Sequence, residues 1–153
     1  MNYKNLDFDT KYKCSLDRVV DGDTVDVCID LGFDVLIRKR CRLYGIDTPE
    51  SRTSDLEEKK YGLQSKEKLK KWLLTAMESE KDNIFIELRC KKKDMVDKYG
   101  RVLAEIWIVD NDNETNLNWW LCENHFAVPY EGQNKNDIIQ AHLKNREILG
   151  TLL

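Results

Sequence analysis

A strand-like segment that runs into an acidic loop decides the fold, and it stands at residues 36–50 with the sequence LIRKRCRLYGIDTPE. From Leu36 to Ile46 many charged residues occupy positions that face outward on a strand, which predicts a β-strand. Asp47 and Glu50 follow on either side of a Thr-Pro pair, so the strand is expected to end in a loop that carries carboxylates.

Two further strands precede this segment. Apolar and polar residues roughly alternate from Lys13 to Ile29, and the alternation is interrupted by an Asp21-Gly22 pair that is typical of a tight turn. The first part of the chain therefore predicts a meander of three strands.

The middle of the chain predicts one helix and two more strands. Apolar residues recur at helical spacing between about Glu57 and Lys81, at Leu69, Trp72, Leu73, Ala76 and Met77. Ile84 to Cys90 and Val102 to Val109 have strand composition. The second of these does not alternate cleanly, which predicts burial on both of its faces.

Two more helices are expected at the end. Leu117, Trp120 and Leu121 follow the capping candidates Thr115 and Asn116, and a last helix is expected over Ile138 to Leu149. The predicted order is βββαββαα. Five strands interrupted by a helix after the third predict an α+β fold, a five-stranded OB-fold barrel with three helices.

Composition predicts one globular domain over residues 1–153. The chain is 41% hydrophobic, and its 25 basic residues nearly balance its 28 acidic ones, which excludes a strongly basic nucleic-acid coat protein. We see neither a signal peptide nor a segment long enough to cross a membrane. Five scattered cysteines suggest buried thiols in a reducing compartment. If the chain is complete, an intracellular or cytoplasmic monomer is expected.

Three short motifs carry the functional prediction: Asp21-Gly22-Asp23-Thr24, the loop at 42–50, and Asp97-Lys98-Tyr99-Gly100-Arg101. In order and spacing they resemble the signature of the staphylococcal nuclease family, and the resemblance extends over nearly the whole chain. It implies an OB-fold enzyme that uses calcium to hydrolyse phosphodiester bonds. DNA and RNA are the implied substrates, with low sequence specificity and with 3′-phosphate and 5′-hydroxyl product ends.

Asp23, Asp47 and the main-chain carbonyl of Thr48 are the metal ligands that the resemblance implies. Carboxylate and carbonyl oxygens suit Ca²⁺, whereas the two histidines are not paired with cysteine at the spacing of a zinc site. Each aspartate taken alone is equally well explained as a residue that caps a turn.

Arg42, Glu50 and Arg101 are the implied catalytic residues. The two guanidinium groups would bind the phosphate and its developing charge, and Glu50 would activate or orient the attacking water. Three carboxylates against two arginines leave this site acidic, so a phosphodiester needs a divalent cation before it can bind. Arg42 and Asp47 are five positions apart, which puts them on opposite faces of a regular strand unless a bulge intervenes near Gly45.

Substrate contacts are assigned to Lys98, Tyr99 and Tyr130. Family members often have two tyrosines after the second helix, and this chain offers only Tyr130. Asn124 and His125 replace the glycine that commonly ends that helix, and asparagine is the next-best residue for a left-handed cap. Asn118 matches the family's helix pattern, although a surface or capping amide explains it equally well.

Two non-catalytic alternatives stay open. Some family members have lost their active residues and bind nucleic acid or protein, and an unrelated OB domain would bind single strands without cutting. The latter needs aromatic platforms. Core packing is the better interpretation of the four tryptophans, Trp72, Trp107, Trp119 and Trp120.

Overall fold

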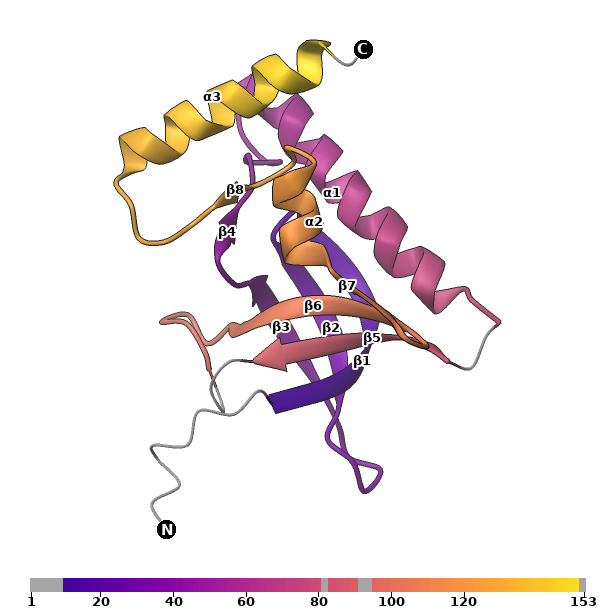
Figure 1. Cartoon of the computed structure of the whole chain (residues 1–153). Coiled ribbons are helices and arrows are strands. Elements are labelled where there is room, and N and C mark those ends of the chain that lie inside the picture. The colour runs from indigo at the N-terminus through magenta and orange to yellow at the C-terminus, as the bar shows by residue number, and fades with distance from the viewer. Residues whose placement is uncertain (1–9, 81–82, 91–94, 152–153) are drawn as a thin grey trace.

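Five strands close into a barrel in the computed structural model, which describes residues 10–80, 83–90 and 95–151 (Figure 1). They are β1 (Thr10–Asp21), β2 (Thr24–Asp30), β3 (Leu36–Leu43), β5 (Ile84–Cys90) and β6 (Val102–Asp110). Antiparallel pairing runs from β3 through β2, β1 and β5 to β6. A short parallel pairing of Cys41–Leu43 with Val102–Ala104 joins β3 to β6, and this closure confirms the predicted barrel.

Three short strands were not predicted. β7 (Asn113–Asn116) extends the sheet beside β6, while β4 (Ile46–Asp47) pairs with β8 (Val128–Pro129) as a separate two-stranded sheet. The strand predicted to run to Ile46 therefore ends at Leu43 and resumes as β4.

The three predicted helices are present as α1 (Leu56–Met77), α2 (Leu117–Glu123) and α3 (Lys135–Thr151). Asp55 caps α1 and Asn116 caps α2, each through a side-chain oxygen that accepts two backbone N–H groups. In Figure 1, α1 runs along the barrel and α3 lies across the end that carries β8. None of the helices in these parts of the chain combines the length and apolar character needed to cross a bilayer.

The core lies inside the barrel and under α1. Leu69 and Leu73 of α1 are fully buried against side chains such as Val25, Leu88 and Ile106 of the strands. Burial of this apolar surface is the main force that holds the helix on the barrel.

The prediction that β6 is buried on both faces holds only in part. Ala104, Ile106 and Ile108 are buried on one face and Val109 on the other, whereas Trp107 is half-buried, with the Arg89 guanidinium 3.9 Å from the centre of its ring. After α2 the left-handed residue is His125, with φ of 68°, whereas Asn124 keeps a negative φ of −99°.

The five cysteines are free thiols in the described structure. Cys41 and Cys90 are buried in the core, and burial raises the pKa of Cys14 to about 12. The prediction of buried thiols is therefore confirmed for two of them, and the other three are half-buried.

Candidate active site

Two aspartates and one arginine meet at one end of the barrel. Asp23 stands in the turn between β1 and β2, and Asp47 stands in β4. The Arg42 guanidinium at the end of β3 lies between them, with Nη1 3.3 Å from Asp23 Oδ2 and Nη2 3.6 Å from Asp47 Oδ1. Arg42 thus bridges the two carboxylates that the sequence assigns to a metal.

An interruption of the strand between β3 and β4 brings the side chains of Arg42 and Asp47 to the same side. Gly45 has a positive φ of 78°, which a residue with a side chain rarely adopts, and the Tyr44 backbone N–H is tied to the Ala104 carbonyl at 2.9 Å. Because of this irregular backbone at Gly45, Arg42 and Asp47 lie on the same side although five positions separate them, a spacing that puts them on opposite faces of a regular strand.

The candidate catalytic and metal-binding residues line a single cavity of about 290 Å³, which we call the acidic pocket. Its lining comprises Asp21, Asp23, Thr24, Arg42, Asp47, Thr48, Pro49, Glu50 and Arg101. Asp21 also lines the pocket, although it was not among the predicted site residues. It belongs to the turn motif, but the motif does not show which of Asp21 and Asp23 faces inward. Asp21 accepts a hydrogen bond from the Ser51 hydroxyl and lies 3.6 Å from the Arg52 guanidinium.

The acidic pocket has an excess of negative charge. Four carboxylates face two guanidinium groups, which leaves a formal charge of −2, one unit more negative than the sequence suggested. The pKa of Glu50 is raised, first by partial burial and then by the nearby carboxylates of Asp23, Asp21 and Asp47. Such a pocket repels a phosphodiester unless positive charge is added.

Arg101 reaches the acidic pocket from the turn at residues 97–101, which is stabilised by Asp97, the ion-pair partner of Arg101. Asp97 accepts hydrogen bonds from the backbone N–H groups of Tyr99 and Arg101, and Arg101 Nε lies 2.6 Å from Asp97 Oδ2. Desolvation acts to raise the pKa of Asp97, but the hydrogen bonds from Arg101 and Tyr99, together with the charge of Arg101, outweigh it and hold that pKa below its usual value.

Asp23 is held in place by three donors. Thr24 Oγ1 donates to one carboxylate oxygen at 2.9 Å, while the Thr48 backbone N–H at 3.3 Å and Arg42 contact the other. Thr48 itself is buried, with 4% of its surface exposed. Asp23 and Thr48 are therefore fixed relative to each other before any ligand binds.

His142 of α3 was not predicted as a residue of the site. Its Nε2 lies 2.7 Å from Asp47 Oδ2, and its Nδ1 is buried without a hydrogen-bond partner in the described residues. Only the packing of α3 beside β8 brings this histidine to the site, and a lone histidine on a helix does not reveal such a contact.

The donors in the acidic pocket fit calcium chemically. They are carboxylate, hydroxyl and main-chain oxygens, the ligand set that Ca²⁺ prefers over nitrogen or sulfur. Among the described residues no three His, Cys, Asp or Glu side chains are arranged as a ready-made metal cluster. Asp23 and Asp47 are instead turned toward Arg42.

The loop that carries Glu50 rests directly on α1. A Cβ built at Gly62 would lie 2.3 Å from the Glu50 carbonyl oxygen and 2.7 Å from the Ser51 nitrogen, so only glycine allows this approach. Glu58 of the same helix also accepts a hydrogen bond from the Glu50 backbone N–H at 3.3 Å.

Replacing Gly62 with alanine is expected to push this loop away from α1. The overlap with backbone should cost about 1–3 kcal/mol, which exceeds the roughly 1 kcal/mol that alanine gains in helix propensity. Thermal denaturation would measure the loss. Gly150→Ala is the matched control, because a Cβ there meets nothing within 4 Å in α3, and it should leave stability unchanged or raise it. Equal stability of the two variants would contradict the close packing.

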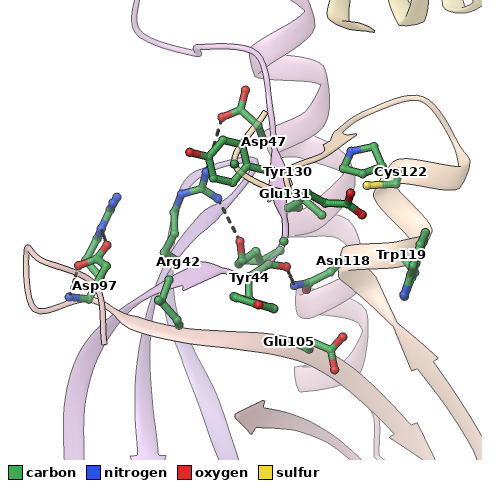
Figure 2. Close-up of a pocket in the computed structure, with 17 residues that line it drawn as sticks. Arg42, Tyr44, Asp47, Asp97, Glu105, Asn118, Trp119, Cys122, Tyr130 and Glu131 are labelled. Atoms are coloured by element: carbon green, nitrogen blue, oxygen red, sulfur yellow. Dashed lines mark hydrogen bonds and ion pairs between the residues drawn. The ribbon is translucent and has the colours of Figure 1, made fainter. Parts of the chain in front are cut away.

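A second, larger cavity of about 870 Å³, which we call the groove, continues from the acidic pocket and shares Arg42, Asp47 and Arg101 with it. Figure 2 shows Arg42 and Asp97 on one side, Trp119 on the other, and Tyr44 and Glu105 between them. Of the predicted substrate contacts, Tyr130 lines the groove. Lys98 and Tyr99 line neither cavity and lie on the adjoining turn, where Tyr99 is 72% exposed.

Comparisons with known proteins agree with this architecture. The sequence model of the family described as "Staphylococcal nuclease homologue" matches residues 40–148. A protein called Thermonuclease from Staphylococcus intermedius is 36% identical over 93 residues, which cover 61% of this chain and 47% of that protein. The chain thus spans about half the length of this curated relative. By the extent of the family match, the chain belongs to the staphylococcal nuclease homologues.

Proposed function

We propose that this chain is a calcium-dependent nuclease that hydrolyses phosphodiester bonds of DNA and RNA with low sequence specificity. The observation that carries the proposal is the single acidic pocket in which Arg42, Arg101 and Glu50 face Asp23 and Asp47. The name of the related thermonuclease supports the same reaction class.

Each residue has a distinct role in the proposed reaction. Asp23, Asp47 and the Thr48 carbonyl would hold a calcium ion, which when bound supplies the positive charge that the acidic pocket lacks and polarises a phosphate oxygen. Arg42 and Arg101 bind the remaining phosphate oxygens and stabilise the charge that builds as phosphorus becomes five-coordinate.

Glu50 orients the attacking water and accepts its proton. Its raised pKa makes it a stronger base than an ordinary glutamate. Water then attacks phosphorus in line with the bond to the 5′ oxygen. That bond breaks, the 5′ oxygen takes a proton from solvent, and the products are a 3′-phosphate and a 5′-hydroxyl.

Calcium dependence gives the first test. Labelled single-stranded DNA and RNA should be cut in calcium and remain intact in excess chelator, while circular dichroism shows that the chelated protein stays folded. The new 5′ ends should accept phosphate from a polynucleotide kinase without prior dephosphorylation. Cleavage at the same rate in chelator would refute the mechanism, and a folded protein that binds but never cuts would be a non-catalytic binding module.

A further inference from the structure

Trp119 is exposed although the residues around it in α2 are packed. Leu117, Asn118 and Leu121 are buried, and Trp120 packs edge-on against Trp72 with ring centroids 5.5 Å apart. Trp119 keeps 58% of its surface exposed and lines the groove, so its assignment to the core is wrong. An indole left in solvent beside a cavity is a flat apolar surface available for stacking.

The Trp119 end of the groove also carries an acceptor for hydrogen bonds. Glu105 of β6 lines it, and its Oε2 accepts from Asn116 Nδ2 at 3.2 Å, which leaves Oε1 without a partner in the described structure. Asn118, by contrast, is fully used by backbone groups and offers nothing to a ligand.

The two ends of the groove differ in charge. The arginines that line it, Arg42 and Arg101, both belong to the end shared with the acidic pocket. In the proposed reaction a phosphate binds at that end once a cation has offset the acidic charge, whereas the end with Trp119 and Glu105 suits a group that is flat, uncharged and rich in N–H donors.

We propose that Trp119 and Glu105 form a subsite for a nucleobase next to the nucleotide whose phosphate is cut, and that this subsite favours bases with an exocyclic amino group. The inference rests on the proposed nuclease function and extends it to base preference. The Trp119 ring would stack on the base, and Glu105 Oε1 would accept from the amino group of cytosine or adenine. Thymine presents carbonyl oxygens in that position and is disfavoured.

Binding of labelled hexadeoxynucleotides tests the subsite without requiring hydrolysis. The probes are dC, dA and dT hexamers with phosphorothioate linkages throughout, which resist cleavage, and their affinity in calcium is measured by fluorescence anisotropy. Wild-type protein should bind the dC and dA hexamers at least about fivefold more tightly than the dT hexamer. Binding should also change the tryptophan emission.

Two variants and one control separate the contributions. Trp119→Ala should weaken binding of every hexamer about tenfold and remove the emission change, and Glu105→Ala should abolish the preference for dC over dT. Phe33→Ala is the control, because Phe33 is a fully exposed aromatic residue at the β2–β3 turn, outside the groove, and it should bind as wild type does.

The outcomes distinguish this inference from the proposed function. Binding of Trp119→Ala within twofold of wild type, or a preference that survives Glu105→Ala, would overturn the subsite even if the protein cuts DNA. A wild-type protein that cuts nothing but shows these ratios would keep the subsite and lose the nuclease assignment.

Discussion

Replacing Glu50 with glutamine should lower the rate of phosphodiester cleavage at least about 100-fold, the scale expected when a general base is removed. Glutamine keeps the size of the side chain but cannot take up the proton of the attacking water. Initial rates on single-stranded DNA in saturating calcium would measure the effect.

The same variant should be at least as stable as wild type when calcium is absent. Burial and three neighbouring aspartates raise the pKa of Glu50, which means that the fold disfavours its charged form. A neutral glutamine removes that repulsion, so the melting temperature in chelator should stay the same or rise. A variant that unfolds more easily, or one that cuts at the wild-type rate, would contradict the role given to Glu50.

Replacing Asn118 with alanine should destabilise the protein by about 3 kcal/mol, because three backbone groups lose a partner together in two buried hydrogen bonds and one partly buried one. Asn118 Oδ1 accepts from the Ile106 N–H at 3.1 Å, and its Nδ2 donates to the Tyr44 and Ala104 carbonyls at 2.9 and 3.3 Å. For a domain of this size the melting temperature should fall by about 10 °C.

Asn124→Ala provides the matched comparison for Asn118→Ala. Asn124 also donates to a carbonyl, that of Trp120, but this hydrogen bond is exposed to water. Its loss should change stability by no more than about 0.5 kcal/mol. If urea denaturation gave the two variants similar stabilities, the bridging role of Asn118 would be wrong.

The barrel strands and helices were predictable because each contains enough residues to reveal its periodicity. β4 and β8 have two residues each, and β7 has four, so no pattern can appear in them. Their positions depend on pairing with strands distant in sequence. The same limit applies to Asn118. The alternative to its match with the family's helix pattern, a surface or capping amide, is wrong, since Asn118 is buried and bridges β6 to the segment before β4.

The motifs predicted which residues meet in the acidic pocket, but the contacts that hold those residues in place could be identified only from the three-dimensional structure. The contact of His142 with Asp47 spans 95 positions, and Gly62 supports Glu50 by a backbone approach that composition cannot reveal. Trp119 was misjudged for a different reason. Trp120 shares a helix face with Leu117 and Leu121, while Trp119 points away from that face, so assigning both tryptophans to the core ignored the helical periodicity.

The parallel pairing of β3 with β6 has a consequence for how activity appears during folding. The paired residues, Cys41–Leu43 and Val102–Ala104, are about 60 positions apart, and contacts of such long sequence separation form late and slowly. Arg42 is itself one of the paired residues and Arg101 directly precedes Val102, so the second arginine joins the first only when the barrel closes. A nascent or truncated chain that ends before Arg101 keeps Asp23, Asp47 and Glu50 but lacks the second guanidinium group, so the proposed cleavage would require the chain to be made beyond that residue.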